Sequence, residues 1–92
     1  LYGREEVIEL LLAKGADIHA VTKQGWTALS LATYKGYVKV VELLLVKGAD
    51  IHAVDKQGWT ALSLAAYNGY VKIVELLLAK GADIHAVDKQ GW

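Results

Sequence analysis

Three histidines recur at one interval: His19, His52 and His85 are spaced by 33 residues. Imidazole is the commonest protein ligand for metals and the side chain whose charge changes near neutral pH, so a metal site and a pH switch are the first chemistries to consider. Equivalent atoms in stacked helical repeats lie about 8 to 10 Å apart, whereas zinc holds its ligands at about 2 Å. We therefore predict no metal and no cofactor, and we expect these histidines to hydrogen-bond neighbouring loops. A further hypothesis is that their joint protonation loosens those loops in acid.

Nucleophilic chemistry is limited to hydroxyl groups, because the chain contains no cysteine. Ser30 and Ser63 are examples, and both fall within short predicted helices rather than at the strained turn that presents a catalytic serine. The glycines occur singly at predicted turns, without the spacing of a phosphate-binding loop. The sequence therefore predicts no enzyme.

Lysine lies three residues before tryptophan in each copy of one motif, as in Lys56 and Trp59. This pairing superficially resembles a platform for single-stranded nucleic acid. Asp55, directly before that lysine, offsets its charge, and ten Lys plus Arg balance ten Asp plus Glu in the whole chain. A net charge of zero gives no general attraction to nucleic acid or to an anionic membrane, and the apolar runs are far shorter than the ~20 residues that span a bilayer. We expect a soluble protein that binds neither; the lack of cysteine is compatible with the cytoplasm, and the compartment stays open.

These residues belong to a repeating unit, which must position them. Residues 15–47 and 48–80 differ at five positions, which leaves 28 of 33 identical. The differences are Thr22/Asp55, Thr33/Ala66, Lys35/Asn68, Val40/Ile73 and Val46/Ala79. Residues 81–92 repeat residues 48–59 without a change. A period of this length is typical of a helical solenoid, in which neighbouring copies stack to bury a continuous core.

Each unit contains signals for two helices and one long loop. Thr27 is suited to cap a helix over about residues 28–34, which Gly36 ends. The second helix is expected over residues 38–47, where polar side chains are so few that it must be covered on most sides. Residues 48–59 then predict an extended segment that ends in a tight turn, which we call a finger. The predicted fold class is all-α.

The unit resembles the ankyrin repeat. The residues that carry the resemblance in the second copy are Asp55, Gly58, Thr60, Leu62, Ala65, Ala66, Gly69, Ile73, Val74, Leu76, Leu77, Leu78, Gly81, Ala82, Asp83 and Ala86. The resemblance implies a right-handed ankyrin-repeat solenoid with one helix-turn-helix and one β-turn finger per repeat. In that register the chain is a single domain over residues 1–92, with partial repeats at 1–14 and 81–92 and full repeats at 15–47 and 48–80.

The unit departs from the ankyrin pattern in three places. The family's proline is Ala28, its first histidine is Ser30 and its second histidine is Tyr37, and the second copy has the same residue types. The usual tie between threonine and histidine of neighbouring repeats therefore lacks its histidine. In the family register both ends fall within a repeat and carry no capping sequence, so we expect exposed apolar ends and head-to-tail self-association.

The resemblance also implies a site, because ankyrin proteins bind partner proteins on a concave surface made by finger tips and first helices. The candidate partner-binding residues are Val21, Lys23, Gln24, Trp26, Tyr34, Lys35, Val54, Lys56, Gln57, Trp59, Tyr67, Asn68, Lys89, Gln90 and Trp92. Tryptophan and tyrosine are the residue types that dominate interface energy. Two interpretations of the tryptophans stay open: they anchor a partner, or each one packs against the adjacent finger.

The candidate site is almost the same in both full copies, since it differs at the Lys35/Asn68 position and otherwise matches. A surface fitted to one irregular partner is expected to differ between repeats. Either the partner itself repeats at about the 8 to 10 Å spacing of packed helices, or the array is engineered or recently duplicated and fitted to no partner. The sequence favours a scaffold for protein–protein interaction, with an array that has no evolved partner and stacks on itself as the alternative.

Overall fold

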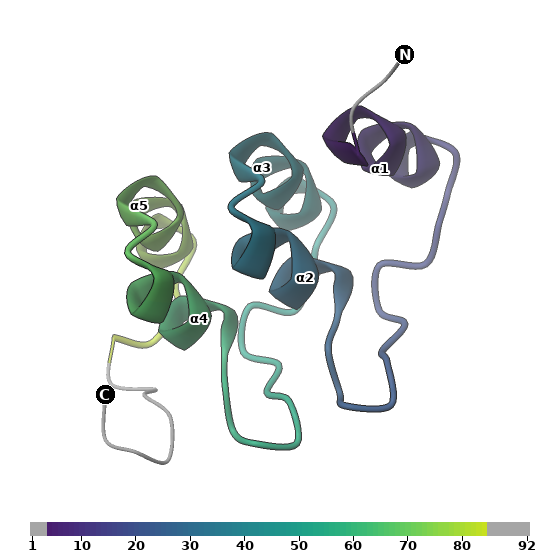
Figure 1. Cartoon of the computed structure of the whole chain (residues 1–92). Coiled ribbons are helices and arrows are strands. Elements are labelled where there is room, and N and C mark those ends of the chain that lie inside the picture. Colours follow the sequence, from purple (N-terminus) through teal and green to yellow (C-terminus); the bar gives the residue numbers. More distant parts are fainter. Residues whose placement is uncertain (1–3, 85–92) are drawn as a thin grey trace.

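The computed structural model describes residues 4–84, which form five helices. Long loops over residues 14–27 and 47–60 alternate with two-residue connections at 36–37 and 69–70. The helices are α1 (Arg4–Ala13), α2 (Ala28–Lys35), α3 (Val38–Val46), α4 (Ala61–Asn68) and α5 (Val71–Ala79). Helices α1, α3 and α5 form one row, α2 and α4 form a second row, and the fingers project away from both (Figure 1). No strand occurs between residues 4 and 84, so the all-α prediction is confirmed.

The first helix of each repeat begins at a threonine and ends at a glycine. The Oγ1 atom of Thr27 accepts a hydrogen bond from the Ser30 backbone N–H at 3.1 Å, and the Ser30 hydroxyl accepts one from the Thr27 N–H at 3.3 Å. Gly36 then adopts a left-handed φ of 76°, which glycine reaches without a steric penalty. The predicted cap and stop are therefore confirmed, and the serine that replaces the family's histidine completes the cap.

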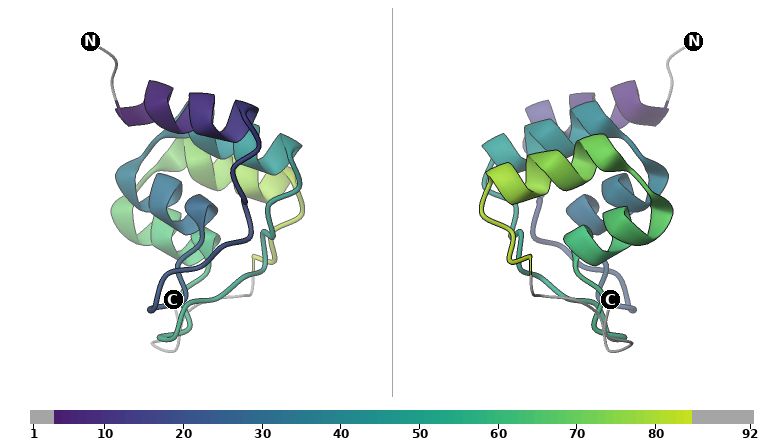
Figure 2. Two further views of the ribbon diagram at one scale, coloured as in Figure 1. Left: turned by 90° about the vertical axis from the view of Figure 1, so that its right-hand side faces the viewer. Right: turned by 90° about the vertical axis from the view of Figure 1, so that its left-hand side faces the viewer.

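The second helix of the middle repeat is covered on three sides. Helix α3 packs against its own partner α2 and against α1 and α5, the corresponding helices of the neighbouring repeats (Figure 2). Val40, Val41 and Leu44 have no exposed surface, whereas Val46 at the helix end is 75% exposed. The helix ends one residue earlier than expected, because Lys47 is its C-cap. The expected cover thus holds for most of the helix and fails at its last turn.

A tyrosine in the turn between α4 and α5 joins its repeat to the preceding one. The hydroxyl of Tyr70 donates a hydrogen bond to the backbone carbonyl oxygen of Tyr34 at 3.3 Å. Its ring lies on Gly36, where an added Cβ would come within 3.1 Å of the Tyr70 Cζ atom. The departure from the family's histidine therefore leaves a tie between repeats, made by a different residue through a backbone carbonyl.

No helix in the part of the chain that the structure describes is long and apolar enough to cross a membrane.

Candidate binding surface

The second finger is closed by a buried aspartate. The Oδ1 atom of Asp55 accepts hydrogen bonds from the backbone N–H groups of Gln57 at 2.8 Å and Trp59 at 2.9 Å. The Asp55 N–H in turn donates to the Trp59 carbonyl oxygen at 3.0 Å. These three bonds close a tight turn and fix the backbone from which the Trp59 side chain projects.

The first finger is closed in the same way by a threonine. The Oγ1 atom of Thr22 accepts from the N–H groups of Gln24 at 3.3 Å and Trp26 at 3.1 Å. The Thr22 N–H donates to the Trp26 carbonyl oxygen at 2.9 Å. The two fingers therefore have the same shape although the residue that closes them differs.

Neighbouring fingers are in direct backbone contact. The Lys56 N–H donates to the Gln24 carbonyl oxygen at 3.0 Å. Gly25 has a φ of 84°, and an added Cβ there would lie 3.2 Å from the Asp55 Cα atom. Glycine is required at this position both by its left-handed backbone and by the approach of the next finger. The finger tips thus form a fixed row.

Each tryptophan forms a pair with the tyrosine of the helix that follows it. The rings of Trp26 and Tyr34 lie 5.4 Å apart at 77°, and those of Trp59 and Tyr67 lie 5.4 Å apart at 81°. These are edge-to-face contacts, which favour a fixed ring orientation. Both tryptophans are partly buried, while Tyr34 is 49% and Tyr67 is 59% exposed. Each pair therefore consists of a partly buried tryptophan packed against an exposed tyrosine.

Two hollows lie beside these ring pairs. We call the two ring pairs and the residues that line the two hollows the aromatic surface. The first has a volume of about 450 Å³ and the second about 230 Å³. Lining the first are Thr22, Gln24, Trp26, Leu31, Tyr34 and Lys35. Lining the second are Trp26, Tyr34, Asp55, Gln57, Trp59, Leu64 and Tyr67. Trp26 and Tyr34 line both, so the aromatic surface is continuous from one repeat to the next.

Seven of the fifteen expected site residues line this surface: Gln24, Trp26, Tyr34, Lys35, Gln57, Trp59 and Tyr67. Lys23, Lys56, Val21 and Val54 are exposed on the fingers but do not line either hollow. Asn68 is partly buried, and its Nδ2 atom is buried without a hydrogen-bond partner. Lys89, Gln90 and Trp92 lie outside the described residues.

Sequence reasoning missed four residues that line the hollows: Thr22, Leu31, Asp55 and Leu64. For Thr22 and Asp55 a signal was present in the sequence, since they occupy one of the five positions that differ between the copies. The two leucines gave no such signal, because a leucine in an apolar helix is expected in the core.

The two described finger histidines are exposed. Their backbone N–H groups donate to Asp17 Oδ1 at 2.8 Å and Asp50 Oδ1 at 2.9 Å, and these bonds lie within each finger rather than between fingers. Between residues 4 and 84, no group of three histidine, aspartate or glutamate side chains is arranged to hold a metal ion. His85 lies outside that range.

Comparison with known proteins identifies the family of the repeat. Residues 1–88 match the family model described as ankyrin repeats in three copies. No curated protein matches the sequence. The matched range includes every helix and both described fingers, and hence the whole aromatic surface.

Proposed function

Because the chain belongs to the ankyrin repeat family, we propose that it is an interaction scaffold that binds a partner protein on the aromatic surface. Ankyrin repeats generally mediate protein–protein interaction and are typically not enzymes. The aromatic surface is the candidate because it combines large, oriented rings with hollows beside them. Such rings bury much area at a small cost in side-chain entropy, which is the property of binding hot spots.

The two ring pairs carry the proposal. The distance between the rings of Trp26 and Tyr34 equals that between the rings of Trp59 and Tyr67. A bound segment of a partner therefore meets the same ring pair twice. Exposed Lys35 lines the first hollow beside Trp26 and Tyr34, and the exposed Lys23 and Lys56 lie on the fingers that carry the tryptophans. An extended partner segment that places one apolar side chain in each hollow and acceptor groups beside the lysines fits this arrangement.

The test is to select binders from a displayed library of random peptides on the immobilised full chain. The indole N–H signals of the three tryptophans are then followed in amide NMR spectra as a selected peptide is added. We expect the Trp26 and Trp59 signals to move. Binders that shift only amides of the row formed by α1, α3 and α5 would contradict the proposal.

A second candidate function is a scaffold with no evolved partner, either engineered or produced by repeat expansion, that associates head to tail with itself. The near-identity of the copies supports it, because nothing distinguishes one ring pair from the next. A heterologous contact of this kind need not close, so it would give a growing series of species. Analytical ultracentrifugation over a wide concentration range decides between the two. A monomer at every concentration would remove this candidate.

A further inference from the structure

The second hollow of the aromatic surface is lined by both ring pairs. Trp26 and Tyr34 belong to one repeat, and Trp59 and Tyr67 belong to the next. These four aromatic residues are among the seven that line a volume of about 230 Å³, and Asp55 is another of the seven. Four rings and one carboxylate group therefore line a single space between neighbouring repeats.

Asp55 is the one charged residue among those seven. It is 8% exposed, and the two hydrogen bonds that its Oδ1 atom accepts come from backbone N–H groups, which carry no formal charge. The exposed finger lysines, Lys23 and Lys56, do not line the hollow. Closure of a finger requires no charge, because Thr22 closes the first finger with the same pattern of bonds. Asp55 therefore gives the second hollow a negative charge that none of the described lysines balances within it.

The first hollow shares one ring pair with the second but has the opposite charge. Thr22 lines it in place of Asp55, and Lys35 lines it where the next copy has Asn68. None of the described acidic side chains lines it. Of the five positions that differ between residues 15–47 and 48–80, these two change charge and the other three do not. The near-identical copies thus differ in charge at or beside the aromatic surface and nowhere else.

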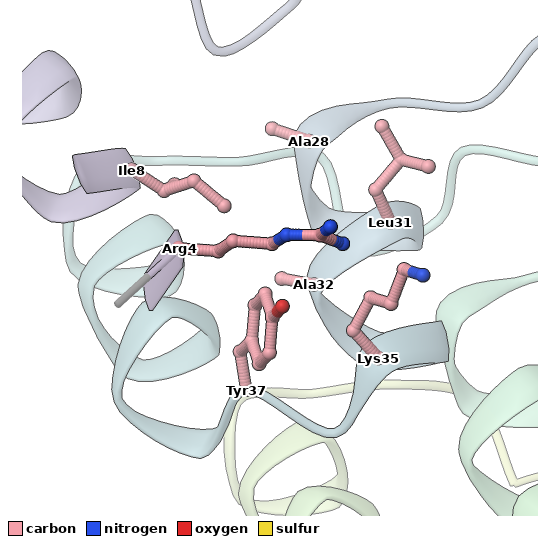
Figure 3. A pocket seen from close by; sticks show the side chains of 7 residues that line it. All are labelled: Arg4, Ile8, Ala28, Leu31, Ala32, Lys35 and Tyr37. Carbon is pink, nitrogen blue, oxygen red and sulfur yellow. The ribbon is translucent and has the colours of Figure 1, made fainter. Parts of the chain in front are cut away.

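The side of α2 that faces α1 is also cationic. Arg4 and Lys35 line a third hollow, of about 310 Å³, between α1 and α2 (Figure 3). The Arg4 side chain extends from α1 across this hollow toward α2 (Figure 3). None of the described acidic side chains lines it. A positively charged group of a ligand is therefore disfavoured on that side of α2 and favoured in the second hollow.

We propose that the second hollow binds a lysine or arginine side chain of the partner. This inference rests on the proposed function, because it names the chemistry of the partner segment at one place on the aromatic surface. Ammonium and guanidinium groups are attracted to aromatic rings. The methylene stem of such a side chain is apolar and packs against the rings. Its charged end lies beside Asp55, where a charge-assisted hydrogen bond is available.

Three five-residue peptides with capped ends test the preference for a cation. They are Gly-Gly-Lys-Gly-Gly and the same peptide with arginine or norleucine at its centre. Norleucine keeps the four-carbon stem of lysine and lacks its charge. Each peptide is added to the full chain, and its dissociation constant is measured from the NMR shifts of the Leu64 methyl groups and the Trp59 indole N–H. The lysine and arginine peptides are expected to bind at least about threefold more tightly than the norleucine peptide.

Two leucines report on the two hollows separately. Leu31 lines the first hollow and Leu64 lines the second, and both have the same neighbours in sequence. We expect the lysine peptide to shift the Leu64 methyl signals and to leave those of Leu31 in place, because Lys35 repels a cation from the first hollow. Equal shifts at both leucines would overturn the assignment of the cation to the hollow that Asp55 lines.

Asp55→Asn tests the role of the carboxylate. The variant keeps an Oδ1 atom that accepts the two backbone hydrogen bonds and removes the charge. It is expected to weaken binding of the lysine peptide by at least about threefold and to leave the norleucine peptide unaffected. Asp50→Asn is the matched control, because Asp50 accepts a bond from the His52 N–H in the same finger and does not line the hollow. It should leave both affinities unchanged.

A second variant guards against a change in the shape of the finger. Asp55→Thr introduces the side chain that closes the first finger, and it is expected to remove the preference for lysine over norleucine as Asp55→Asn does. Circular dichroism shows whether the helices of both variants are intact. A preference for lysine that persists in both folded variants would overturn the role assigned to Asp55.

The outcomes separate this inference from the proposed function. Peptides selected from the displayed library that shift the Trp26 and Trp59 indole signals, yet contain no lysine or arginine, would overturn the cation assignment and leave the aromatic surface as the binding site. Equal affinity for the three short peptides, or no shift with any of them, would also overturn the cation assignment. A preference for the cationic peptides that is lost in Asp55→Asn and kept in Asp50→Asn is the result that the proposal predicts.

Discussion

At the scale of single residues, the finger turns are made by two different side chains in the same position. Thr22 and Asp55 each accept two backbone hydrogen bonds, but the carboxylate bonds are shorter, at 2.8 and 2.9 Å against 3.3 and 3.1 Å. Hydrogen bonds to an ionised acceptor are stronger than neutral ones. The aspartate finger is therefore expected to be the more stable of the two.

Exchange of these residues tests this difference. Thr22→Asp is expected to raise the free energy of unfolding by about 0.5 to 1 kcal/mol, and Asp55→Thr to lower it by a similar amount. Urea denaturation followed by circular dichroism measures both. A loss of stability in Thr22→Asp would mean that the carboxylate does not reproduce in the first finger the bonds it makes in the second.

Two glycines with the same backbone offer a matched pair. Gly36 and Gly69 have φ values of 76° and 73°, so an alanine at either position bears the same strain, about 1 kcal/mol. At Gly36 the added Cβ would also lie 3.1 Å from the Tyr70 ring, whereas at Gly69 nothing lies within 4 Å. Gly36→Ala is therefore expected to destabilise the chain more than Gly69→Ala. Equal urea midpoints for the two variants would show that the Tyr70 ring moves aside without cost.

The helix cap at Thr27 and the hydrogen bond from Tyr70 to the neighbouring repeat show which residue roles a sequence can predict. The Thr27 cap was predicted correctly because its partner, Ser30, lies three residues away and the geometry is local. The Tyr70 tie was not predicted, because its partner carbonyl lies 36 residues away in sequence. Every residue has a backbone carbonyl, so the sequence does not indicate which one accepts this hydrogen bond. Only the stacking of the repeats brings the Tyr34 carbonyl to the Tyr70 hydroxyl.

At the scale of the helices, burial within α3 decides which side chains hold the stack together. Leu44 has no exposed surface and faces a core shared by neighbouring repeats, while Val46 is 75% exposed. Leu44→Ala is expected to cost about 2 to 5 kcal/mol, because it removes buried methyl groups and leaves a cavity. Val46→Ala should change stability by less than about 0.5 kcal/mol. Thermal denaturation that gives the two variants similar losses would contradict this assignment of the core.

The helices could be placed from the sequence, but their exposed faces could not. The apolar spacing and the capping residues give the bounds of α2 and α3 to within one residue. Leu31 and Leu64 have the same neighbours in sequence, yet one is 43% and the other 6% exposed. The difference depends on which helix lies alongside, so the hollow of the aromatic surface that Leu31 lines became visible in the structure alone.

At the scale of the whole molecule, the repeats stabilise one another through the contacts between neighbours. The α2/α4 and α3/α5 contacts join one repeat to the next. Stability in such a solenoid is approximately a sum of repeat terms and interface terms. Insertion of a further copy of residues 48–80 directly after Lys80 is therefore expected to raise the melting temperature and the urea midpoint. A longer chain that melts no higher would show that the interfaces contribute no net stability.

The repetition also limits what the whole sequence can say about function. The period and the family pattern lead to the solenoid, and the family leads to protein binding in general. Two copies that differ at five positions carry little information about one particular partner. The aromatic surface depends on ring orientations and on side chains from different repeats, which the order of residues does not specify.

The most direct test of the central claim is the dissociation constant of a selected partner peptide for three forms of the chain: the original, Trp26→Ala with Trp59→Ala, and Val46→Ala. If the aromatic surface binds the partner, removal of both indoles raises the dissociation constant by at least about tenfold, as expected for hot-spot residues. Val46→Ala, on the exposed end of α3, leaves it unchanged. An affinity that survives the loss of both tryptophans would contradict the account.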